Sequence, residues 1–294
     1  MVRLRISVLT LLAMIAFAGN SLFCRVALKN TSIDPATFTL VRLLSGACVL
    51  WLTVRFAPRA RGKVLGNWWS GFALFVYAAA FSQAYVSLPA AAGALLLFGA
   101  VQATMIGYGL WAGERLGRAQ MLGLVLAGGG LIFLLLPGLS APSLRGSVLM
   151  ISAGVAWGIY SLRGKGSVNA TAMTEGNFLR AACFALLISG VRLVGSANGA
   201  LGGASWDRAG LVYAVLSGAI TSGLGYAVWY SALRELNVTT AATVQLSVPV
   251  LAALGGVALL GEVITLRLVI AAAAILSGVL LVIAAKQRRP QQSI

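Results

Sequence analysis

The chain has 294 residues, of which 60% are hydrophobic and only 10% are charged, with a mean hydropathy of +0.93. Because a soluble domain carries roughly 25% charged residues, this composition excludes a water-soluble protein and indicates an integral membrane protein. The formal net charge of +16 does not indicate nucleic-acid binding, because Lys and Arg are spread over short gaps between apolar stretches, where they set orientation in a membrane.

The apolar stretches predict ten transmembrane helices, each approaching the roughly 20 residues needed to cross about 30 Å of hydrocarbon. Turn and charge signals such as Asp34-Pro35 and Pro137-Gly138 separate them. We therefore predict an all-α integral membrane protein. In chain order the helices are expected at residues 6–28, 34–55, 68–86, 90–112, 117–137, 146–163, 174–194, 209–233, 239–260 and 266–285.

The two halves of the chain resemble each other. Gly113-Glu114 ends the fourth apolar stretch, and Gly261-Glu262 ends the ninth stretch 148 residues later. We expect a first repeat at residues 1–143, holding helices one to five, and a second at residues 144–294, holding helices six to ten. Because five is odd, the second repeat starts on the opposite side of the membrane, and the repeats are inverted. Such duplication is typical of transporters that work by alternating access.

Charge and glycine content predict the orientation and leave the oligomeric state open. If both termini share one side, that side holds 14 Lys and Arg residues and the other holds 6, so both termini are expected in the cytoplasm. The 35 glycines exceed the average share, and small residues let helices approach closely in lipid. This packing fits one subunit or a dimer contact, so both a monomer and a homodimer remain open.

Several of these features together resemble the EamA type of the drug/metabolite transporter superfamily. They are the two repeats, an Arg early in the second helix of each half (Arg42 and Arg180), Pro249, and Leu260-Gly261-Glu262. The opening stretch with Asn20 to Phe23 is most similar to an aromatic amino acid exporter of that superfamily. This resemblance implies export of aromatic and other apolar amino acids across a bacterial inner membrane. It also implies that helices 1, 3, 4, 6, 8 and 9 line the substrate site.

The missing residue types argue against catalysis and against proton coupling. The chain has no His, and all six carboxylates fall at predicted helix ends or in loops, so no proton relay is expected near the membrane midplane. We therefore expect uniport without strong proton coupling, and no catalytic residue, metal or cofactor. The alternatives are a proton-coupled exporter of another metabolite or drug, a channel, and, least favoured, an intramembrane enzyme.

Two arginines within predicted spans allow two readings. Arg42 and Arg180 occupy matching places in the two repeats. We favour a structural role, in which each ties carbonyls of loops or helix ends or reaches the membrane surface. Direct substrate binding is the second reading, because charges inside membrane spans usually mark function.

Pro249 is expected in the middle of the ninth helix, where the missing N–H frees the carbonyl of Gln245 for a substrate ammonium or leaves a simple kink. Other polar and aromatic residues at mid-span are expected to bind the substrate. For any one polar residue alone we favour helix packing, and for any one aromatic residue alone lipid contact is the alternative. The expected partners are an amino acid substrate and the lipid bilayer. The candidate substrate-binding residues are Phe17, Asn20, Phe81, Phe98, Gln102, Trp157, Tyr160, Ser222, Tyr226, Trp229, Gln245 and Pro249.

Overall fold

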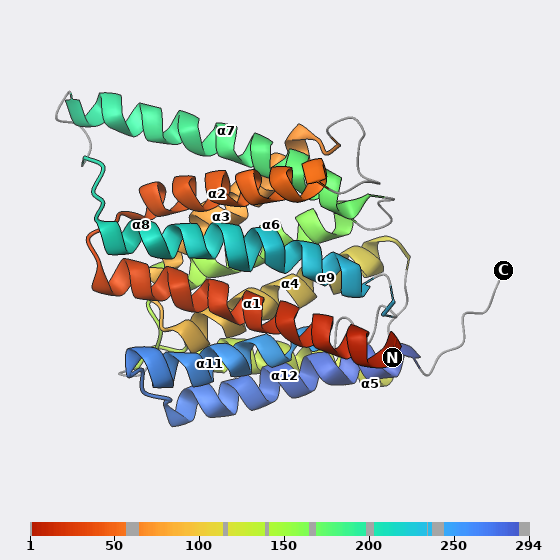
Figure 1. The fold of residues 1–294 in the computed structure, drawn as a ribbon. Coiled ribbons are helices and arrows are strands. Elements are labelled where there is room, and N and C mark those ends of the chain that lie inside the picture. The colour runs from red at the N-terminus through yellow and green to blue at the C-terminus, as the bar shows by residue number, and fades with distance from the viewer. Residues whose placement is uncertain are drawn as a thin grey trace.

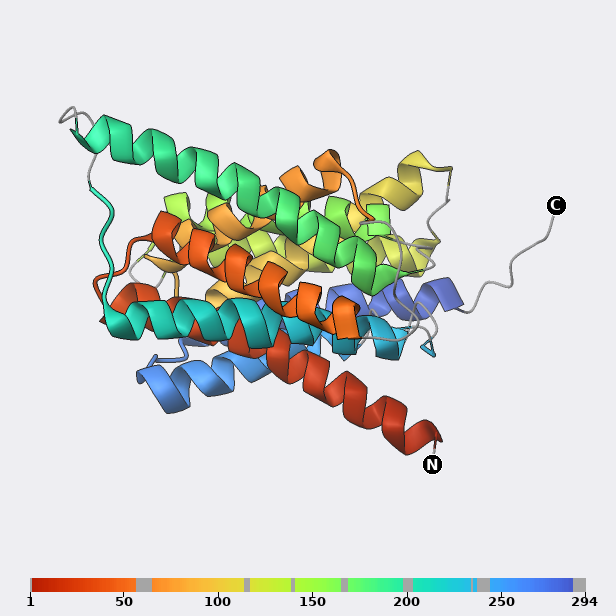
Figure 2. The ribbon, with the colours of Figure 1, turned by 45° about the horizontal axis from the view of Figure 1, so that its top comes forward.

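The computed structural model shows a bundle of helices that run side by side along most of their length (Figure 1). It describes residues 2–56, 65–113, 117–138, 141–164, 169–197, 203–233, 235–236 and 244–287, and these ranges contain no strand. The start of α1 and the end of α12 lie at the same end of the bundle (Figure 2). We call this the inner end, and the opposite end the outer end.

The helices of the first half match the predicted stretches to within a few residues. They are α1 (Val2–Asn30), α2 (Pro35–Phe56), α3 (Trp68–Tyr85), α4 (Ala90–Trp111) and α5 (Arg118–Leu135). Asn67 caps α3, because its side chain accepts a hydrogen bond from the Ser70 N–H. Glu114, part of the repeat signal, lies outside the described residues.

The second half differs from expectation in its middle. Its helices are α6 (Leu144–Gly164), α7 (Ala170–Ala197), α8 (Arg208–Val215), the π-helix η1 (Leu216–Leu224), α9 (Gly225–Leu233), α11 (Ser247–Leu260) and α12 (Leu266–Gln287). The predicted helix at 209–233 is one continuous rod, α8–η1–α9, that is widened to a π-helix at its centre. Such segments are rare and are frequent at functional sites.

The positions of Pro249 and Glu175 differ from those expected from the sequence. Residues 239–243 of the predicted ninth helix lie outside the described residues, and the helix is interrupted at Leu246, so that Pro249 sits in the first turn of α11 rather than at mid-helix. The interruption lies where Pro249, which has no N–H, leaves the Gln245 carbonyl without a helical donor. Because α7 begins at Ala170, Glu175 is inside a helix and buried, not at a helix end.

Seven helical stretches in the described part of the chain are long and apolar enough to cross a membrane. They are 4–30, 35–56, 90–111, 118–135, 170–196, 208–232 and 266–285. The helix α11, with 14 residues, is apolar but shorter. The chain is therefore a multi-pass membrane protein by composition and length.

The helices pair in a regular way. The pairs α5 with α12 and α2 with α7 each join helices that hold the same place in the two predicted repeats, and α1 packs on α8–η1–α9 while α6 packs on α3. In the same way α1 packs on α11 as α6 packs on α4. This arrangement places α1, α3, α6 and η1 around the middle of the bundle.

Glycines allow the closest of these contacts. A Cβ on Gly218 of η1 would collide with the Arg42 carbonyl oxygen of α2, and a Cβ on Gly123 of α5 would lie 2.6 Å from the Gly278 carbonyl oxygen of α12. Since no real Cβ contact is that short, these positions hold helix backbones together only as glycine.

Candidate functional site

Aromatic rings from five helices meet in the middle of the bundle. Trp157 of α6 is central, with ring centroids 4.8 Å from Tyr77 of α3 and 4.9 Å from Tyr226 of α9. Phe17 of α1 meets Tyr226 at 5.9 Å and Trp229 at 5.8 Å. Further ring contacts add Phe81, Tyr160 and Phe178. We call these eight residues the aromatic cluster: Phe17, Tyr77, Phe81, Trp157, Tyr160, Phe178, Tyr226 and Trp229.

Six of the predicted site residues thus come together, and two residues of the cluster were missed. The predicted six are Phe17, Phe81, Trp157, Tyr160, Tyr226 and Trp229. Tyr77 has a sequence signal, because it precedes Phe81 by four residues and so shares its helix face. Phe178 has no comparable signal, since its role depends on how α7 packs against α2.

A buried polar network borders the cluster. Asn20 Nδ2 donates to the Tyr77 hydroxyl at 3.2 Å, and Ser217 Oγ donates to Asn20 Oδ1 at 2.7 Å. Arg42 joins the same tyrosine, since its Nη2 donates to the Tyr77 hydroxyl at 3.0 Å, and its Nε donates to Ser222 Oγ at 3.2 Å. The predicted Asn20 and Ser222 therefore lie at the cluster, held by α1, α3 and η1.

Arg42 and Arg180 have different surroundings despite their matching places. Arg180 Nη1 donates to the carbonyl oxygens of Leu65 and Gly176, as the structural reading expects. Arg42 is 1% exposed, and among the described residues its hydrogen bonds go to the Ser222 and Tyr77 hydroxyl groups rather than to a carbonyl oxygen. Its guanidinium carbon lies 5.1 Å from the ring centroid of Tyr77 and 4.9 Å from that of Phe81. These hydroxyl and ring contacts differ from the carbonyl or surface contacts that the structural reading expects.

The remaining predicted residues are not joined to the cluster. Phe98 and Gln102 are buried in α4, but no ring contact or hydrogen bond links them to the cluster in the described part of the chain. Gln245 is half-buried, and Pro249 is buried in the first turn of α11. Phe98 and Gln102 were predicted from their mid-span position, which does not determine the direction in which a side chain points. Gln245 and Pro249 were predicted from the carbonyl that a proline frees.

An ion pair fastens several helix ends together at the outer end. Arg25 Nε of α1 lies 3.0 Å from Glu262 Oε1, and Arg25 Nη1 donates to the carbonyl oxygens of Tyr85 and Val86. Glu262 Oε2 also accepts from the Ala90 N–H at 2.7 Å, at the start of α4, where a carboxylate is stabilised by the helix dipole. These contacts connect α1, α3, α4 and the segment between α11 and α12.

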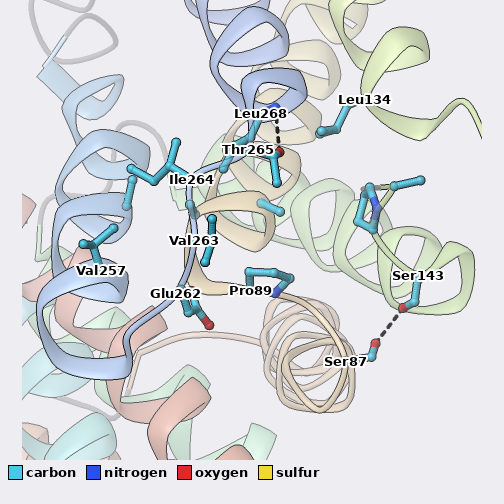
Figure 3. A pocket seen from close by; sticks show the side chains of 15 residues that line it. Ser87, Pro89, Leu134, Ser143, Val257, Glu262, Val263, Ile264, Thr265 and Leu268 are labelled. Atoms are coloured by element: carbon cyan, nitrogen blue, oxygen red, sulfur yellow. Dashed lines mark hydrogen bonds between the residues drawn. The ribbon is translucent and has the colours of Figure 1, made fainter. Parts of the chain in front are cut away.

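A small cavity lies beside this ion pair (Figure 3). It has a volume of about 250 Å³ and is lined by Pro89, Glu262, Val263, Thr265 and residues around them. Ser87 and Ser143, which hydrogen-bond to each other at 2.7 Å, stand at one side of it. It is separate from the aromatic cluster, since none of its lining residues belongs to that cluster.

Two aspartates complete the outer end. Burial of the Asp34 carboxyl tends to raise its pKa, but hydrogen bonds from Thr37, Arg192 and Ser205 outweigh this and lower the pKa below its usual value. Backbone hydrogen bonds from Ser32 and Gly210 lower the pKa of Asp207. Both carboxylates are thus held ionised between the loops that lead into α2 and α8.

Comparison with known proteins supports one family. Residues 144–284 match the EamA-like transporter family. The chain contains an EamA-like domain. This domain is of the drug/metabolite transporter superfamily, and it points to a membrane transporter rather than an enzyme.

Relatives of this chain extend over most of its length. An uncharacterised protein of Pseudomonas aeruginosa is 54% identical over 97% of this chain and 96% of its own. An uncharacterised transporter of Archaeoglobus fulgidus is 26% identical over 83% of this chain and 85% of its own. A crystal structure with 18% identity superposes with a TM-score of 0.67 over 97% of this chain and 99% of that one, which shows a shared fold.

Proposed function

We propose that the protein exports small neutral or zwitterionic solutes across a bacterial inner membrane, and that aromatic and other apolar amino acids are its main substrates. The observation that carries this proposal is the aromatic cluster, bordered on one side by Asn20, Arg42 and Ser222. Rings suit an apolar side chain, and the polar border suits the charged end of an amino acid.

Alternating access between two inverted repeats is the proposed mechanism, with repeats at residues 1–143 and 144–294 and both termini in the cytoplasm. The matched packing of α1 on α8–η1–α9 and of α6 on α3 supports it, because a two-fold relation between the halves produces such pairs. The aromatic cluster draws on these same helices, so a movement of one half against the other would expose it to either side.

Transport is proposed to be uniport. The aromatic cluster and its polar border contain no carboxylate or His, and a zwitterion carries no net charge for the membrane potential to act on. Among the residues that the structure describes, Glu175 of α7 is the buried carboxylate that proton coupling would require, so Glu175→Gln is the variant to test.

Reconstitution into liposomes tests substrate and coupling together. We expect labelled Phe, Trp, Tyr and Met to equilibrate across the membrane at rates that saturate, with no accumulation when a pH gradient is imposed. The Glu175→Gln variant should behave in the same way. Concentrative uptake that collapses with the gradient would contradict uniport, and failure of all four amino acids to move would contradict the substrate class.

A further inference from the structure

We propose that Arg42 binds the carboxylate group of the transported solute. This assignment rests on the proposed transport function and narrows its substrate to monocarboxylates that carry an apolar or aromatic group. The carboxylate, rather than the ammonium group, is then the charged feature that the site recognises.

Only some of the N–H donors of the Arg42 guanidinium have a hydrogen-bond partner. Nε donates to Ser222 Oγ and Nη2 donates to the Tyr77 hydroxyl, but Nη1 is buried without a hydrogen-bond partner. Both of its partners are neutral hydroxyl groups. The guanidinium carbon lies 5.1 Å and 4.9 Å from the ring centroids of Tyr77 and Phe81, so this cation stands within the polar border of the aromatic cluster.

A buried charge of this kind requires an anion. In the described part of the chain the ion pairs are Arg25 with Glu262 and Arg192 with Asp34, both at the outer end, and neither includes Arg42. An unpaired charge is very costly to bury, so proteins pair it or bind a counter-ion. The planar fork of an Arg matches a carboxylate, which can accept two parallel hydrogen bonds.

The surroundings define the class of anion. One guanidinium balances a single negative charge, whereas a phosphate dianion would require further cations. The neighbouring rings of Tyr77, Phe81 and Trp157 offer an apolar surface to the rest of the molecule. The nearby Asn20, Ser217 and Ser222 offer neutral groups to an ammonium, so a carboxylate without an ammonium should bind as well.

Ligand-dependent thermal unfolding of the full-length protein in detergent tests the assignment without relying on transport. The probes are 3-phenylpropanoate, its neutral amide 3-phenylpropanamide, and 2-phenylethylamine. We expect only the carboxylate to raise the unfolding temperature, since the ligands share a phenyl group and differ in charge. In liposomes the carboxylate should also compete with labelled Phe, while the amide and the amine should not.

Two variants distinguish carboxylate binding by Arg42 from a general effect of removing a positive charge. Arg42→Gln should weaken binding of the carboxylate about tenfold or more, because a charge-assisted hydrogen bond is lost. Arg180→Gln, the same change at the matching place of the other repeat, should leave this binding unchanged. If Arg42→Gln does not fold, the three-ligand series on the unchanged protein still decides.

The outcomes distinguish this inference from the proposed function. Equal stabilisation by the carboxylate and the amide, or stabilisation by neither, would overturn the role of Arg42. Selective stabilisation by the carboxylate, together with no movement of any amino acid into liposomes, would uphold Arg42 and overturn amino acid export.

Discussion

Trp157 is a central residue of the aromatic cluster. Its ring contacts Tyr77, Tyr160 and Tyr226, and so it joins α3, α6 and α9. Removing its indole ring takes away a large part of the apolar protein surface that we propose contacts the substrate. An edge-to-face or stacked pair of rings contributes roughly 0.5–1.5 kcal/mol beyond burial.

We therefore expect Trp157→Ala to raise the KM for Phe roughly tenfold or more in liposome uptake. Trp111→Ala is the matched control, because Trp111 is 83% exposed at the end of α4. Equal effects of the two changes on uptake would show that the central ring does not contact the substrate.

Single residues also show where sequence reasoning succeeds and fails. Mid-span position together with aromatic character correctly brought Phe17, Trp157 and Trp229 to one place. Mid-span position gave no direction for Gln102, and the early place of Arg42 in its helix gave no direction for its side chain. The burial of Arg42 depends on the hydroxyl groups of Tyr77 and Ser222, which lie 35 and 180 residues away in the chain.

Among the helices, η1 and α2 make the contact that holds the site together. Gly218 lets η1 approach the backbone of α2 at Arg42, and Ser222 on the next turn then reaches the Arg42 side chain. A larger residue at 218 would push the two helices apart, because the position faces backbone that cannot move aside.

We expect Gly218→Ala to destabilise the protein by roughly 1–3 kcal/mol, as overpacking does, and to lower transport. In contrast, Gly107→Ala in α4 adds a methyl group in open space and should be neutral or slightly stabilising. Thermal unfolding in detergent measures both. A Gly218→Ala protein as stable as the Gly107→Ala protein would contradict the close contact.

The boundaries of the helices were predictable where apolar runs end in turn residues, as at Asp34-Pro35 between α1 and α2. The prediction failed around η1 and Pro249. A π-helix can have the same apolar composition as an α-helix, so composition does not reveal it. A proline is tolerated in the first turn of a helix and disrupts its interior, so its effect depends on where the helix starts.

For the molecule as a whole, the outer end of the bundle is closed by charged contacts that span both halves. Arg25 and Glu262 belong to α1 and to the segment before α12, and Arg192 and Asp34 to α7 and the start of α2. Any movement that opens the bundle at this end has to separate such pairs. They therefore bear on the balance between conformations as well as on stability.

The change Glu262→Gln should lower stability by roughly 1–3 kcal/mol, since it weakens hydrogen bonds to a charged group at Arg25 and at the Ala90 N–H. The exposed Glu235 provides the control change Glu235→Gln, which removes the same charge. Unfolding temperatures of the two variants give the comparison. Equal values would mean that the Arg25–Glu262 pair contributes nothing.

The π-helical segment η1 has one further consequence. In a π-helix each N–H donates to the carbonyl five residues back instead of four. Each residue therefore turns the chain by less than the 100° of an α-helix. If η1 tightened to α-helical geometry, α9 would rotate about its own axis relative to α8. Tyr226 and Trp229 would swing away from Phe17 and Trp157 while α8 stayed fixed between its neighbours. A twist within one helix, without a hinge between domains, would then be enough to release a bound solute.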